Sequence, residues 1–496
     1  MTNYTKFAVK SAGVVFIISL VAAFLGYLVR FILARNLAVE EFGLFYAVFA
    51  FLTLLSLFKS LGFDKALIKF IPELIHRNKK DLIKSSIIYA AVIQFITNTL
   101  IIVLIYLLSK YLSLNFFHNP NADIILKLMA IAFFIDSFVL VLMFSFQGFQ
   151  KMGIFASIDM IRMLIILAVI LIGIKLNYGI LSPVIAYIIS PALLLVIFGW
   201  IFVGKIFPDF FASRFVFDKN LVKKISKYGI FIVAVTAANM ILWTTDTIVL
   251  TYFSGLKEVA LYNIALPTAK ILLYFPLAMG YVLFPLVSEL WIKQKKEILK
   301  AGIELLYKYS MIIVLPLAFI MLSFAALIIN VLFGEDYILA SNLLKILSIG
   351  IIFATLHNIG VNFFLGVGKP KTYSKIIYGA ALFNLAANLI LIPILGAVGA
   401  ALSTTLSYFI MMLLGLRKIR KYIIIELPIK IWIKTLAAGL IFVFVMWLLK
   451  KFISLNVWLE TVIVLALSGI VYIALLFLLR IININELKDL YKRITK

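Results

Sequence analysis

Long apolar segments recur through the whole sequence and decide what kind of protein it can form. A membrane-spanning α-helix needs about 20 mostly apolar residues. Fourteen segments meet this requirement, and the short connections between them leave no room for a soluble domain. We predict membrane-spanning helices at residues 11–34, 42–63, 85–109, 122–147, 156–175, 179–204, 228–253, 262–288, 305–331, 340–366, 374–395, 397–416, 431–450 and 457–480.

The composition agrees with a lipid environment. Of the 496 residues, 65% are hydrophobic and 14% are charged, whereas soluble domains are about half apolar and about a quarter charged. The first apolar run is too long for a cleavable signal peptide and lacks a cleavage site, so we expect its helix in the mature protein. The absence of cysteine and the scarcity of histidine lead us to expect neither disulfides nor a metal site.

Positive charge is concentrated on alternate connections. If the N-terminus lies inside, the inside segments and their flanks hold roughly 35 of the 46 Lys and Arg residues, the bias that sets orientation in membranes. We therefore expect both termini in the cytoplasm, and we do not interpret the net charge of +25 as nucleic-acid binding. The inside segments are 64–84, 148–155, 205–227, 289–304, 367–373, 417–430 and the tail after Arg480.

Three pairs of short motifs are separated by nearly the same number of residues. Gly148 matches Gly366, 218 residues later. Phe45 matches Tyr262 and Gly179 matches Gly396, and in both pairs the separation is 217 residues. Helices 1–6 thus correspond to helices 7–12. Because six is an even number, we predict two parallel six-helix lobes related by a pseudo-twofold axis along the membrane normal.

The repeat divides the chain into two lobes and a C-terminal extension. We predict an N-terminal lobe at 1–204, a cytoplasmic linker at 205–227, a C-terminal lobe at 228–416, a second linker at 417–430, two further helices at 431–480 and a cytoplasmic tail at 481–496. Two similar lobes can close alternately on either side of a central cavity. Since no catalytic motif is present, we expect a transporter and not an enzyme.

Charged residues inside the spans are candidates for function because their burial in lipid is costly. Arg30 lies about one turn from the outer end of the first helix, where it either faces the cavity or extends to the surface. Asp246 shares one helical stripe with Asn239 and Trp243, which predicts that it faces the cavity. The alternative for Asp246 is a structural salt bridge, for example with Arg30.

Lys270 lies on a second polar stripe with Asn263, Pro267 and Tyr274. Pro267 frees a main-chain carbonyl and can kink the helix. A cation beside Asn and Tyr suits phosphate or another acid, although a structural pair with Asp246 or extension to the surface remains open. The predicted substrate-binding residues are Arg30, Asn239, Trp243, Asp246, Asn263, Lys270 and Tyr274.

Four further polar residues are candidates for cation coupling or for structure. Asp136 and Arg162 can form an ion pair that joins the fourth and fifth helices. Asn384 and Asn388 lie four residues apart on the eleventh helix and can form interhelical hydrogen bonds. We expect no cofactor apart from coupling to H⁺ or Na⁺, which the sequence leaves open.

The helix count and three segments resemble the multidrug/oligosaccharidyl-lipid/polysaccharide exporter superfamily, and within it the polysaccharide-synthase or O-antigen-type flippases. The segments are 37–73, which includes GFDKAL, FQGFQKMGIFASIDMIR at 146–162, and TDTIVLTYFSGLKEVALYNIALP at 245–267. The resemblance implies an all-α, MATE-like fold of fourteen transmembrane helices. It also implies that Arg30 and Lys270 match, by helix, the cationic cavities of lipid II flippases.

The same resemblance implies a function in the cytoplasmic membrane. It predicts a flippase that translocates polyprenyl-diphosphate-linked oligosaccharide by alternating access, for surface polysaccharide or glycoprotein biosynthesis. We expect a monomer in contact with membrane lipids and with glycosyltransferases or a polymerase of the same pathway. The alternative is a cation-coupled antiporter of multiple drugs or organic cations, which would require an acidic cavity, whereas the five charged candidates inside the predicted spans are three basic residues and two acidic ones.

Overall fold

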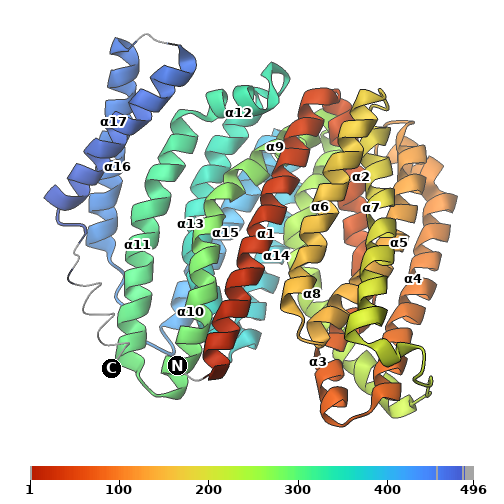
Figure 1. The fold of residues 1–496 in the computed structure, drawn as a ribbon. Coiled ribbons are helices and arrows are strands. Elements are labelled where there is room, and N and C mark those ends of the chain that lie inside the picture. The colour runs from red at the N-terminus through yellow and green to blue at the C-terminus, as the bar shows by residue number, and fades with distance from the viewer. Residues whose placement is uncertain (1–2, 454–455, 483–484, 486–496) are drawn as a thin grey trace. The chain divides into compact units, whose positions relative to one another are not determined.

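The computed structural model describes residues 3–453, 456–482 and 485, and these residues form helices joined by short loops, without a strand among them (Figure 1). In this part of the chain, 14 helices are long and apolar enough to cross a membrane, which confirms the predicted number. The chain is therefore a multi-pass integral membrane protein. Most of the predicted tail at 481–496 lies outside the described residues.

The α-helices follow one another closely along the chain. They are α1 (Asn3–Asn36), α2 (Val39–Leu55), α3 (Phe63–His76), α4 (Lys80–Asn115), α5 (Ala122–Gly148), α6 (Met152–Lys175), α7 (Leu181–Ile201), α8 (Lys219–Phe253), α9 (Leu256–Lys270), α10 (Tyr274–Ile292), α11 (Lys296–Ser323), α12 (Ala325–Phe333), α13 (Ala340–Gly366), α14 (Pro370–Leu395), α15 (Ala397–Ile419), α16 (Ile429–Phe452) and α17 (Val457–Leu478).

The chain forms two compact units. The first comprises Met1–Ile264, Leu332–Tyr337 and Ala381–Ala400; in it α1 packs on α6, α4 packs on α5, and α8 lies along α2 and α3. The second comprises Ala265–Val331, Ile338–Ala380 and Ala401–Lys496; in it α13 packs on α10 and α11, and α16 packs on α11 and α17. The lobe boundaries and the pseudo-twofold axis derived from the repeat stay predictions.

The predicted helix at 42–63 and the predicted loop at 64–84 are wrong in detail. α2 ends at Leu55, a 3₁₀ turn covers Ser56–Phe58, and a further helix, α3, occupies Phe63–His76. The chain turns at Gly62, whose φ is 77° and where a Cβ atom would lie 2.6 Å from the Cα of Gly229. Only glycine meets both conditions without strain. α3 buries one apolar face and carries charge elsewhere, so average hydropathy does not reveal it.

Two other predicted helices are broken in the structure. The segment predicted as one helix at 262–288 consists of α9, a 3₁₀ turn at Ile271–Leu273 and α10. The expected disturbance by Pro267 therefore appears about one turn later along the chain. The segment predicted at 305–331 consists of α11 and the separate short helix α12.

Candidate functional site

Arg30 is held by protein atoms from two other helices. Its guanidinium lies 4.1 Å from the ring centroid of Tyr46 on α2 and donates a hydrogen bond to the main-chain carbonyl of Asn263 on α9. In a regular helix that carbonyl would accept from the residue four positions later, which is Pro267 and has no N–H. Arg30 thus supplies the donor that proline lacks, which favours a site inside the protein over extension to the surface.

Asp246 lies in a buried polar cluster formed by α8, α9 and α14. Its side chain is 1% exposed, and its carboxylate accepts hydrogen bonds of 2.5 Å from the Tyr262 hydroxyl and from Asn388 Nδ2. Asn388 Nδ2 also donates to Asn384 Oδ1 at 3.1 Å, and Thr245 Oγ1 donates to the same oxygen at 3.2 Å. One carboxylate is therefore surrounded by amide and hydroxyl groups.

The environments of Arg30 and Asp246 meet on α9. Tyr262, which donates to Asp246, directly precedes Asn263, whose carbonyl accepts from Arg30. The Asn263 side chain donates to Thr247 Oγ1 on α8 at 3.1 Å. The first unit therefore brings three predicted site residues, Arg30, Asp246 and Asn263, into two adjoining sets of hydrogen bonds that join α1 and α8 to α9.

The other predicted substrate-binding residues lie at several places in the fold. Asn239 is half-buried on α8, whereas Trp243, one turn later, is 61% exposed and does not pack into the core of its unit. Lys270 ends α9 and Tyr274 begins α10; both belong to the second unit and are half-buried. That these four residues share a cavity with Arg30 and Asp246 stays a prediction.

Asp136 forms a second charged cluster, within the first unit. It makes an ion pair with Arg162 on α6, and its Oδ2 lies 3.1 Å from the Nζ of Lys59. Asp159 Oδ1 lies 3.5 Å from Arg162 Nε, so two cations meet two carboxylates. The cluster is formally neutral.

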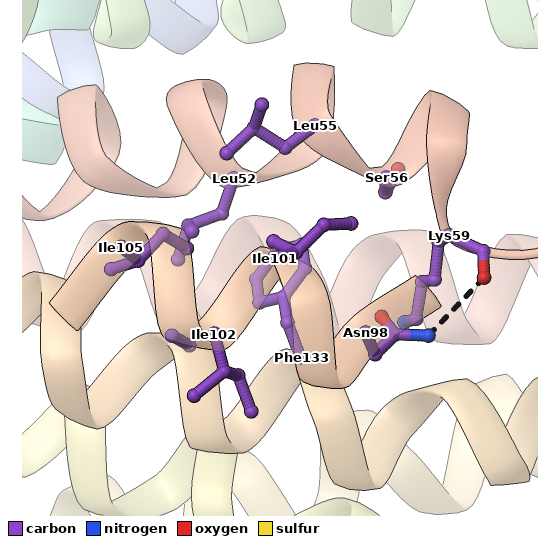
Figure 2. Close-up of a pocket in the computed structure, with 10 residues that line it drawn as sticks. Leu52, Leu55, Ser56, Lys59, Asn98, Ile101, Ile102, Ile105 and Phe133 are labelled. Atoms are coloured by element: carbon purple, nitrogen blue, oxygen red, sulfur yellow. Dashed lines mark hydrogen bonds between the residues drawn. The ribbon is translucent and has the colours of Figure 1, made fainter. Parts of the chain in front are cut away.

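Lys59 was not among the predicted site residues, and its surroundings are tightly packed. Its main-chain carbonyl accepts a 3.2 Å hydrogen bond from Asn98 Nδ2, as Figure 2 shows, and its ammonium lies 5.4 Å from the ring centroid of Phe133. The adjoining cavity has a volume of about 10 Å³ and is walled mostly by apolar side chains such as Leu52 and Ile101. That volume scarcely admits one water molecule. The Asp136 cluster therefore joins helices, and the cavity beside Lys59 is too small for a large substrate.

A larger cavity of about 180 Å³ lies between the turn before α3 and the helices α5 and α8. Ser56, Ser60, Asp64 and Lys65 contribute polar groups to its wall. Lys65 Nζ donates a 3.1 Å hydrogen bond to the hydroxyl of Thr236 on α8. The cavity has room for several water molecules and presents both a cation and a carboxylate. Sequence reasoning missed Lys65 because it assigned the residue to a loop outside the membrane.

Similarities to known proteins extend over the whole chain. A family model described as "Polysaccharide biosynthesis protein" matches residues 8–291, and the MatE model matches residues 234–390. The chain is 35% identical to an uncharacterized membrane protein of Methanocaldococcus jannaschii across 100% of both chains. It is 27% identical, over 40% of its length and 41% of the relative's, to the probable low-salt glycan biosynthesis flippase Agl15 of Haloferax volcanii.

The fold is also similar to a solved structure. Lipid II flippase MurJ in an inward closed conformation superimposes with a TM-score of 0.76 at 18% sequence identity. The similarity covers 92% of this chain and 97% of that one. Together with the fourteen apolar helices, it confirms the fold class predicted from the sequence.

Proposed function

Because the chain belongs to the polysaccharide biosynthesis protein family, we propose that it moves a lipid-linked oligosaccharide across the cytoplasmic membrane by alternating access. One observation carries the proposal: the described residues of this family member form membrane-spanning helices with short connections. Such a structure offers a path through the bilayer, whereas the described part of the chain has no extramembrane domain that could house a glycosyltransferase. The saccharide would serve surface polysaccharide or glycoprotein assembly.

The charge of the substrate is the main obstacle to its passage. A polyprenyl diphosphate carries negative charge that is costly to place in hydrocarbon, while its lipid tail can remain in the bilayer. Arg30 and Lys270 offset that charge in our proposal. A guanidinium has five N–H donors, and the carbonyl of Asn263 takes only one from Arg30, which leaves donors for phosphate oxygens.

The proposed orientation places both chain termini in the cytoplasm. It rests on the concentration of Lys and Arg in alternate connections. Outward movement of an anion is then favoured by an inside-negative potential, by about 2.3 kcal/mol per charge for each 100 mV.

The Asp246 cluster is our proposed site for a coupling cation, either H⁺ or Na⁺. It places the carboxylate of Asp246 among amide and hydroxyl groups, and oxygen atoms of this kind are ligands for a small cation. Asn388 Oδ1 is buried and has no hydrogen-bond partner in the described part of the chain, and it lies on the side chain that contacts Asp246. A buried carbonyl oxygen beside a carboxylate suits a small cation that prefers oxygen ligands.

A liposome assay tests the function directly. The purified protein is reconstituted with a polyprenyl-diphosphate-linked oligosaccharide that carries a nitrobenzoxadiazole label on its sugar, and dithionite is added outside. Label that starts in the inner leaflet should become accessible to dithionite, at a rate that rises with the amount of protein per liposome. Arg30→Ala and Lys270→Ala should each slow this phase several-fold. Arg35→Ala is the matched control, because Arg35 lies on the same helix and also donates to a main-chain carbonyl, that of Leu332, at 3.1 Å.

The same liposomes distinguish the alternatives. Equal movement of labelled phosphatidylcholine would indicate a scramblase and would overturn the proposal. The match to the MatE model keeps the organic-cation antiporter as the second candidate. Accumulation of ethidium driven by a Na⁺ or H⁺ gradient, without movement of the labelled saccharide, would establish the antiporter instead.

A further inference from the structure

The connection between α7 and α8 is held firmly against α4. Residues 214–218 have no regular secondary structure and run beside the first turns of α4. The Tyr89 hydroxyl contributes twice, since it donates to the carbonyl of Val216 and accepts from the N–H of Asp218, both at 2.9 Å. The other bonds run from Arg214 N to Asp81 Oδ1 (2.8 Å), from Val216 N to Ser85 Oγ (2.9 Å) and from Lys84 Nζ to the Ser213 carbonyl (2.8 Å).

This fixed connection nevertheless exposes large aromatic side chains. Phe211 is 76% exposed, Phe217 is 70% exposed and Phe215 is 50% exposed. The rings of Phe215 and Phe217 pack edge-on against Tyr89, with centroids 5.7 and 6.1 Å away, but half or more of each side chain remains exposed. Because the backbone is bonded to α4, the rings cannot be withdrawn by rearranging the loop. An apolar patch of this kind marks a surface that meets something other than water.

The position of Tyr89 along α4 indicates what covers the patch. A stripe of exposed large apolar residues begins at Val92 and ends at Leu114, and at 1.5 Å per residue it is about 33 Å long. That length matches a hydrocarbon core of about 30 Å. Tyr89 lies three residues before Val92, so it and the two rings beside it lie about 4.5 Å outside the hydrocarbon. This is the headgroup layer, where aromatic side chains accumulate.

Cations lie farther out on the same surface. Lys79 precedes α4, and Arg214 is placed near the start of α4 by its main-chain bond to Asp81. Both side chains are exposed, and neither makes an ion pair within the described residues. They lie beside a hollow of about 770 Å³, which is walled by Lys79, Lys80, Asp81, Asp209, Ser213 and others.

Around this hollow the four cations Lys79, Lys80, Lys84 and Arg214 outnumber the three carboxylates Asp81, Asp209 and Asp218. Lys80 lies 2.6 Å from Asp209, Asp81 accepts from the main chain of Arg214, and Asp218 caps α8. On α8, as on α4, exposed cations come before the exposed apolar residues. The exposed lysines of α8 end at Lys227, and its first exposed large apolar residue is Ile230.

We propose that residues 207–218 form an interfacial anchor, which inserts Phe211, Phe215 and Phe217 among lipid headgroups and binds anionic phospholipid through Lys79 and Arg214. Aromatic contact and cationic attraction act together in surface binding of this type. The anchor fixes the depth of the connection between α7 and α8. It does not depend on the proposed transport function, since it requires only that the helices cross a bilayer.

The chain has no cysteine, so single cysteines can be labelled without background. Lys79→Cys, Phe217→Cys and Val92→Cys, each labelled with nitrobenzoxadiazole, form a depth series in nanodiscs of phosphatidylcholine with phosphatidylglycerol. Aqueous iodide should quench Lys79→Cys strongly, Phe217→Cys several-fold less and Val92→Cys least. Equal iodide quenching of Phe217→Cys and Lys79→Cys would overturn the anchor and would indicate that a protein partner, not lipid, covers the patch.

A second comparison tests the lipid charge. Removing phosphatidylglycerol should increase the iodide quenching of labelled Phe217→Cys. Adding Lys79→Gln and Arg214→Gln to that variant should abolish the difference between the two lipid compositions. The double substitution leaves the attachment to α4 intact, because Arg214 contacts Asp81 through its main-chain N–H. Quenching that is independent of phosphatidylglycerol in the parent variant would overturn the proposed binding of anionic headgroups.

Discussion

Gly43→Ala tests whether close helix contact within the first unit depends on the absence of a side chain. Gly43 is buried on α2 and faces the first residue of α9. A Cβ atom there would overlap the main-chain carbonyl oxygen of Leu256 and would lie 2.8 Å from its carbonyl carbon. The start of α9 cannot easily withdraw, since Glu258 accepts a 2.9 Å hydrogen bond from the N–H of Ala397.

The expected effect combines two opposing contributions. Forcing an extra carbon against fixed backbone typically costs about 1–3 kcal/mol. Alanine in place of glycine in a helix interior contributes up to about 1 kcal/mol of stability. The net loss for Gly43→Ala is therefore about 1–2 kcal/mol. Gly199→Ala in α7 is the matched control, because a Cβ atom at Gly199 would have no neighbour within 4 Å.

The free energy of unfolding can be measured for both variants by titrating the purified protein with sodium dodecyl sulfate in mixed micelles and following helical circular dichroism. Both variants gain the stability that alanine gives over glycine in a helix. The difference between their free energies of unfolding therefore isolates the contact with Leu256. Equal stability of the two variants, or a Gly43→Ala protein at least as stable as the wild type, would refute the reasoning.

Three other predictions use the same titration or the liposome assay. Asp136→Asn should lower the free energy of unfolding by roughly 3 kcal/mol, because it leaves two cations without their shared carboxylate; Asp159→Asn, at a side chain that is half exposed, should change it by less than about 1 kcal/mol. Tyr262→Phe removes a donor to a buried carboxylate and should cost about 1.5–3 kcal/mol in the same titration. Asp246→Asn should leave the protein folded in the membrane but make saccharide movement independent of an imposed Na⁺ or H⁺ gradient; a gradient dependence equal to the wild type would place coupling elsewhere.

The membrane-spanning helices could be predicted because span length and apolar content are set by the bilayer itself. The interruptions of the predicted helices could not be predicted, because they depend on contacts with residues distant in the sequence. At Gly62 the main chain turns directly against Gly229, and a sequence pattern does not contain that contact. The error had a consequence for the site, because Lys65 was assigned to a loop outside the membrane when it lines a cavity.

The candidate site could be predicted in its charged members and in its asparagines, Asn263, Asn384 and Asn388, but not in its hydroxyl groups. Arg30 and Asp246 stand out because charge inside a span is rare. Tyr262 belongs to the segment that revealed the repeat, yet its hydroxyl contact with Asp246 depends on how α8 and α9 fold back on each other. A tyrosine in an apolar helix gives no sign of such a contact when the sequence alone is read.

The junction of Gly62 with Gly229 has a consequence for motion. Two stretches of main chain touch there with no side chain between them. Because main chain meets main chain there, the distance between the two segments is set by the backbone and not by side-chain rotamers. With the Lys65–Thr236 hydrogen bond and the rings of Phe70 and Tyr228 on the same two helices, we expect α3 and α8 to move together as one body.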